Sequence, residues 1–202
     1  MKEGFGAILK FFLFLFILPL VIACALAFQA QILGLPVHKE QWILWGALAY
    51  VLCNFFLYNF KDVYNYGHKI VSHLCQFFEP LGNIAGFIVP IYTVLTICLG
   101  LMINLLGLMP RYEGVVLLLL SFSFTMHVVL SASQLYESDS HPVKGQYLCT
   151  FGLTFIIQVF FISLLLWAVI PEFSFMGFFT SLAHHAFDYY RWIYKALFVS
   201  HA

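Results

Sequence analysis

The chain has 202 residues, of which 63% are hydrophobic and only 9% are charged, against roughly 25% charged residues in an ordinary soluble domain. This composition excludes a soluble globular protein and predicts an integral membrane protein. Its 9 basic residues balance its 9 acidic ones, so no basic surface is offered to phosphates and we expect no nucleic-acid partner.

A long hydrophobic segment opens the chain, and we predict the first membrane span over about residues 8–33. Residues 11–32 carry no charge, and this run exceeds the roughly 20 apolar residues needed to cross a bilayer. Cys24 follows a small residue as in a lipoprotein cleavage box, but the residues after it stay hydrophobic, so we expect an uncleaved span. Pro19 predicts a bend within it.

The second span is predicted over about residues 42–60, and an amphipathic helix over about 61–80. In this helix, polar and apolar residues recur at the spacing of opposite helical faces. It has too many charges for hydrocarbon and too many aromatic residues for water, which favours a position in the membrane interface. The predicted apolar face consists of Val63, Tyr66, Ile70, Leu74, Phe77 and Phe78.

Three more hydrophobic segments follow, and we predict spans over about residues 84–108, 115–136 and 146–170. The loop between the first two is short, so these two spans are expected to be antiparallel neighbours. The loop before the last one is the most hydrophilic stretch of the chain, which places it in water or among lipid headgroups.

The C-terminal segment, about residues 174–198, carries a polar stripe at helical spacing. We interpret it as a second interfacial helix. The alternative is a sixth span, in which Asp188 and Arg191 would have to pair with each other or with a partner chain. The polar stripe consists of Ser181, His184, Asp188, Arg191 and Lys195.

The predicted fold class is therefore an all-α polytopic membrane helix bundle, with about five transmembrane helices and two interfacial amphipathic helices in a single domain over residues 1–202. Lysine and arginine are more frequent on the cytoplasmic side of membrane proteins, and this favours a cytoplasmic N-terminus in a bacterial inner membrane. The margin is five basic residues to four. The inside set is Lys2, Lys10, Lys61, Lys69 and Lys144; the outside set is Lys39, Arg111, Arg191 and Lys195.

Four strong hydrogen-bonding side chains lie within the predicted spans: Asn54, Asn104, His127 and Gln158. Each is in line with smaller polar residues or glycine, and such rows turn away from lipid. We interpret them as intramembrane polar contacts rather than a conduction path, because no carboxylate lies within a span. His127 and Gln158 have similar predicted depths, so we expect that they can bond to each other.

The 8 histidines are the other candidates for chemistry. His68 and His73 are five residues apart on one helix, so their side chains diverge and do not chelate one ion. A metal site that combines either of them with Glu79 and His141 is an alternative, since all lie on the predicted cytoplasmic side. His127 is a weak candidate for cofactor binding. We predict no cofactor, with haem or a metal ion as the alternative.

Catalytic sequence motifs are absent, which favours a protein that is not an enzyme. The loops are also too short for a catalytic domain outside the membrane. We therefore expect a non-catalytic membrane subunit that anchors, scaffolds or assembles a larger membrane protein complex. Its expected partners are the lipid bilayer and other membrane subunits, including further copies of the chain. The alternatives are a redox subunit binding haem or metal through histidines, and a small transporter or channel component.

Overall fold

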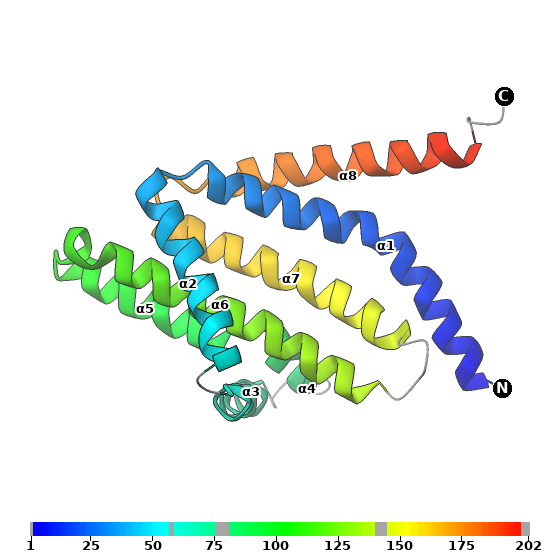
Figure 1. Ribbon diagram of the computed structural model, residues 1–202, viewed down its shortest axis with the longest axis horizontal. Helices are drawn as coiled ribbons and strands as arrows, with labels where there is room; N and C mark the ends of the chain where they lie inside the picture. Colours follow the sequence, from blue (N-terminus) through cyan, green and yellow to red (C-terminus); the bar gives the residue numbers. More distant parts are fainter. Residues whose placement is uncertain (1, 57–58, 76–80, 140–144, 199–202) are drawn as a thin grey trace. The chain divides into compact units, whose positions relative to one another are not determined.

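The computed structural model describes residues 2–56, 59–75, 81–139 and 145–198, and within these residues it consists of α-helices joined by short loops and contains no strand (Figure 1). The all-α fold class is confirmed. The helices are α1 (Lys2–Leu33), α2 (Val37–Phe56), α3 (Lys61–Leu74), α4 (Leu81–Ile88), α5 (Ile91–Leu105), α6 (Met109–Ser138), α7 (Gly145–Val169) and α8 (Phe175–Phe198).

Three of the described helices are long and apolar enough to cross a membrane, namely Leu9–Leu33 of α1 and the whole of α6 and α7. They contain the first, fourth and fifth spans predicted from the sequence. α2 passes the same test only together with α3, from which it is separated by a bend of 118°, as in a broken span or a re-entrant loop. These helices indicate an integral membrane protein.

The third predicted span, residues 84–108, is divided into two helices in the structure. α4 ends at Ile88 and α5 begins at Ile91, with Pro90 between them at φ −77° and ψ 80°. Proline has no N–H to donate to the carbonyl four residues earlier, and its ring clashes with that carbonyl. α5 has 15 residues and is about 22 Å long, less than the roughly 30 Å of a hydrocarbon core.

The chain divides into two compact units, of which unit 1 comprises Met1–Gly34 and Leu135–Ala202 and unit 2 comprises Leu35–Gln134. In unit 1, α1 packs against both α7 and α8. The shared core is formed by Cys24 and Ala27 of α1, Val159 of α7 and Phe178 of α8. Small residues on α1 let the aromatic side chains of the other two helices approach it closely.

Contacts along unit 1 give the direction of its helices. Lys10 donates a hydrogen bond to Gln146 at the beginning of α7 (3.1 Å), and Gly152, further along α7, faces Val21. Residue numbers increase in the same direction along both helices from the first contact to the second, so α1 and α7 are parallel. α8 runs antiparallel to α1, because Gly177 lies against Gln31 and the later residue Tyr190 contacts the earlier residue Phe16 (Figure 1).

In unit 2, α2 runs parallel to the first part of α6. Trp42 lies over Gly114, where an added Cβ would come within 2.5 Å of the indole ring. Two turns further along both helices, the Tyr50 and Phe122 rings are in edge contact at 5.5 Å. Between these points Gly46 touches the Leu118 backbone so closely that no side chain fits, which explains why glycine stands there.

α5 and α4 follow α6 in the opposite direction. Ser123 on α6 donates a hydrogen bond to Thr93 on α5 (3.1 Å), and Gly100 lies against Val116 nearer the beginning of α6. Beyond the break at Pro90, α4 continues along α6 as far as His127. The two short helices therefore line the same side of α6 as one interrupted segment.

α3 packs through a face that the sequence pattern did not single out. Its buried residues are Tyr64, Gly67 and Val71, and this face lies between the predicted polar and apolar faces. Tyr66 and Leu74, from the predicted apolar face, are exposed. α3 thus presents three faces: one against α4 and α5, one polar, and one apolar and uncovered.

Candidate functional site

The candidate site is the junction of α3, α4 and α6 in unit 2. Tyr64, on the buried face of α3, has its hydroxyl 3.0 Å from the Ser131 hydroxyl on α6, and either oxygen can donate. The Tyr64 ring lies 5.6 Å from the His127 ring and 6.0 Å from the His68 ring. Tyr64 therefore connects two histidines from different helices through ring contacts.

His127 forms a hydrogen bond to the backbone of α4, in which its Nε2 lies 3.0 Å from the carbonyl oxygen of Phe87. In a continuous helix the N–H of Ile91 would occupy this carbonyl, but Pro90 takes Ile91 out of α4. The imidazole supplies a donor where the helix is broken. Because Nε2–H donates, Nδ1 of the neutral ring is the acceptor nitrogen.

His68 approaches α4 at Gly86, where an added Cβ would lie 2.5 Å from the imidazole, and it meets the Phe87 ring edge-on at 4.8 Å. Burial lowers the pKa of His68, so the ring is neutral at pH 7. Its Nε2 atom is buried and has no hydrogen-bond partner among the described residues, as is also true of the Tyr50 hydroxyl. These atoms have unused hydrogen-bonding capacity.

The predicted metal ligands separate in the structure. His68 faces α4, whereas His73 is exposed, with Nδ1 3.1 Å from the Lys69 carbonyl oxygen. Glu79 and His141 lie outside the described residues. Among the residues that the structure describes, no group of three or more histidine, cysteine or acidic side chains could hold a metal ion. The residues brought together are thus two histidines and a tyrosine.

The four predicted intramembrane polar residues differ in burial. His127 and Gln158 are buried, Asn54 is half-buried, and Asn104 is exposed in the last turn of α5.

Sequence reasoning looked for side-chain partners and missed the backbone carbonyl that His127 contacts. It also missed Tyr64. Pro90 was the available signal, because a proline in a span frees carbonyls one turn before it.

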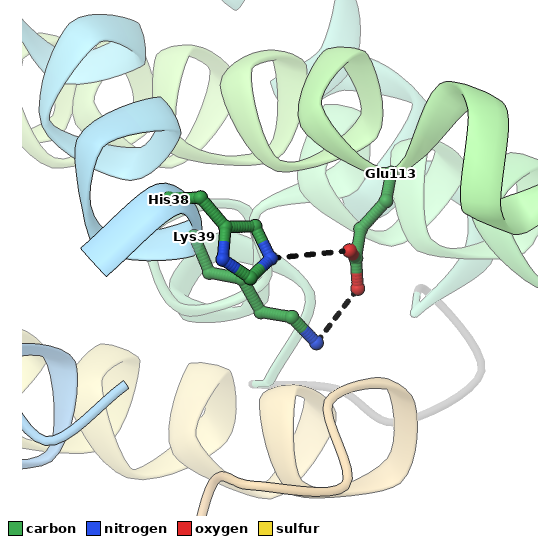
Figure 2. A network of polar contacts seen from close by, with 3 residues as sticks. All are labelled: His38, Lys39 and Glu113. Atoms are coloured by element: carbon green, nitrogen blue, oxygen red, sulfur yellow. Dashed lines mark ion pairs between the residues drawn. The ribbon is translucent and has the colours of Figure 1, made fainter. Parts of the chain in front are cut away.

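A second polar group links the beginnings of α2 and α6 (Figure 2). Lys39 Nζ lies 2.7 Å from Glu113 Oε1, and the side chains are 8% and 29% exposed. His38 Nε2 lies 3.7 Å from the other oxygen of Glu113. Sequence reasoning missed this ion pair as well, because the two residues lie in different loops of the predicted topology.

Comparison of the chain with protein-family models, with curated proteins and with solved structures finds no match.

Proposed function

We propose that the chain is a non-catalytic integral membrane subunit that anchors or assembles a larger membrane protein complex. The observation that carries this proposal is the charged face of α8 beside a membrane span. Near the beginning of α8, Gly177 lies against Gln31 of α1, and further along α8 the Tyr190 hydroxyl donates to the Phe16 carbonyl (2.9 Å). α8 thus follows α1 for about 20 Å.

Further along α8, the charged part of the polar stripe is exposed. His184 and Asp188 form an ion pair at 3.2 Å, with side chains that are 75% and 55% exposed. Asp188 precedes Tyr190 by half a turn, so it lies at the level of the hydrophobic part of α1. An acidic side chain at the bilayer centre costs about 2.5–3.5 kcal/mol, and such side chains normally face protein or water. A partner chain that covers this face removes the cost.

The distribution of basic residues supports the same arrangement. If α8 returns alongside α1 as a sixth span, Lys195 joins the five basic residues on the side of the N-terminus, whereas Arg191, next to Tyr190, lies within the span. Lys39 and Arg111 then remain on the other side, and six against two is a clearer bias than five against four. We therefore propose α8 as a span instead of an interfacial helix.

The proposed topology has crossings at α1, α2, α4 with α5, α6, α7 and α8, with α3 in the cytoplasmic interface of a bacterial inner membrane. The uncovered apolar face of α3 would meet lipid there, and its polar face water. Reporter fusions test this topology. Fusions at Lys69 and after Phe198 should report the compartment of the N-terminus, and one at Gly34 the opposite compartment. Opposite readings for Lys69 and Phe198 would contradict the sixth span.

Complex size tests the proposed function. The chain, extracted in mild detergent from the membrane of its source organism, should sediment as an assembly larger than its own 23.2 kDa plus detergent. Asp188→Leu should release it, because the partner's complementary group loses its counterpart. Arg111→Leu, which removes an exposed charge outside α8, is the matched control and should leave the assembly intact. A monomeric wild-type chain would refute the proposal.

The interrupted helices around His127 favour a second candidate, a small transporter or channel component. Broken helices expose backbone groups at substrate sites of many transporters, and here the break at Pro90 lies next to His127 and His68. Proteoliposomes loaded with a pH-sensitive dye test this possibility. A proton flux that His68→Leu abolishes would support it, whereas tight vesicles would exclude proton conduction.

A further inference from the structure

A groove lies along one side of the contact between α2 and α6 in unit 2, with a cavity volume of about 460 Å³. Its lining changes in character along α2: polar residues stand in the first turns and apolar residues further along. The lining residues are His38, Gln41, Trp42, Trp45, Ala49 and Leu118.

Glycine contacts produce this groove. At Gly46 the backbones of α2 and α6 touch, and at Gly114 the Trp42 indole rests directly on α6. The two helices are therefore held close along one line, while Trp42 and Trp45 project beyond it and remain exposed. The groove follows from large side chains standing beside a close helix contact.

The polar end of the groove lies next to the ion pair of Figure 2. Lys39 and Glu113 balance each other's charge there. The exposed imidazole of His38, through the nitrogen that does not face Glu113, and the exposed amide of Gln41 can donate hydrogen bonds at this end of the groove. Tryptophan beside such polar groups is typical of the membrane interface.

We propose that this groove binds one phospholipid molecule, with an acyl chain against Trp42, Trp45 and Leu118 and the phosphate at His38 and Gln41. The groove lies beside α6, a candidate membrane span, so its apolar part stands at the depth of the hydrocarbon core. From Gln41 to Ala49 it runs about 12 Å, close to the roughly 15 Å hydrocarbon thickness of one leaflet. A membrane phospholipid matches this groove, because it has a polar headgroup at one end and an apolar acyl chain that spans one leaflet.

Native mass spectrometry of the whole chain tests the site. Delipidated protein is titrated with dioleoyl phosphatidylglycerol, and the lipid adducts that survive increasing collision energy are counted. The wild type should retain one lipid. Ala49→Phe, which fills the groove, should lower the retained fraction about tenfold, whereas Ala168→Phe on α7 should not change it. Equal retention in Ala49→Phe and the wild type would show that the lipid is annular only and would overturn the proposal.

Two further measurements keep the test independent of folding. Trp45→Leu changes an exposed side chain and should reduce retention with unchanged helix content by circular dichroism. His38→Ala should weaken retention of phosphatidylglycerol but not of dioleoylglycerol, which lacks the phosphate. Loss of both lipids to the same extent in His38→Ala would contradict the assignment of the polar end.

Discussion

Substitution of His127 tests the most specific contact in the structure. The imidazole donates to the Phe87 carbonyl, at 3.0 Å, at the point where α4 is interrupted. His127→Leu has a similar volume but removes the donor, so this carbonyl loses the hydrogen bond within a buried junction. Leaving a buried acceptor without its partner costs about 1–3 kcal/mol.

Replacing His127 by an amide residue tests whether a side chain of a given length can still reach the Phe87 carbonyl oxygen. Glutamine can place its amide nitrogen close to the position of Nε2, so His127→Gln should keep the bond to Phe87 and cost under about 1 kcal/mol. Asparagine is one methylene shorter and is expected to lose most of the bond. The order of stability should therefore be wild type, Gln, Asn and then Leu.

Thermal unfolding in detergent micelles measures this order, at about 2–4 °C per kcal/mol for a chain of this length. His73→Leu is the control, because it removes an exposed imidazole from the same chain and should shift the transition little. If the Gln and Leu variants unfold at the same temperature, the Phe87 bond contributes nothing. If all three variants lose function with unchanged stability, His127 has a chemical role instead.

Three other outcomes follow from the contacts. Glu113→Gln and Lys39→Met should each destabilise unit 2 by about 1–3 kcal/mol, and the double variant by less than their sum, as a double-mutant cycle in chemical denaturation would show. Gly46→Ala should lower the free energy of unfolding by about 1–3 kcal/mol, because the added methyl group meets the backbone of α6. Gly6→Ala is the control in thermal scans: its methyl group has open space, so this variant should be neutral or slightly stabilising. Burial lowers the pKa of His68, so this imidazole binds a proton more readily in the unfolded chain than in the folded one. The free energy of unfolding should therefore fall as the pH drops through about 6.5, and the fall should be smaller in His68→Gln.

Three of the five predicted spans, the first, fourth and fifth, correspond to helices long and apolar enough to cross a membrane, because long apolar segments have few alternatives there. α6 contains the predicted span over residues 115–136, and α7 contains all but the last residue of the predicted span over residues 146–170. The prediction for residues 84–108 did not divide the span into α4 and α5, although Pro90 was visible in the sequence. A proline in a span is tolerated when neighbouring groups satisfy the freed backbone, and whether the helix kinks or breaks depends on those neighbours.

The candidate site was only partly predictable. His127 stood out as a lone imidazole in a span, but its partner is a main-chain oxygen, which a pattern of side chains does not show. The buried face of α3 depends on Gly67 and Gly86, which let α3 approach α5 and α4 closely. Periodicity assigns residues to faces of a helix, but it does not say which face finds a protein neighbour.

The distance along α6 between the contacts at its two ends is close to the thickness of a membrane. The ion pair at Glu113 and the hydroxyl pair at Ser131 mark two ends of the packed part of unit 2. Eighteen residues separate them, about 27 Å along a helix, against roughly 30 Å for a hydrocarbon core. The packing contacts between them come from glycine, aromatic and neutral hydroxyl groups, which suit hydrocarbon depth, and α3 lies at the Ser131 end. This spacing supports the proposal that α3 lies in the interface, where Tyr64 holds it to the end of the membrane-crossing part of α6.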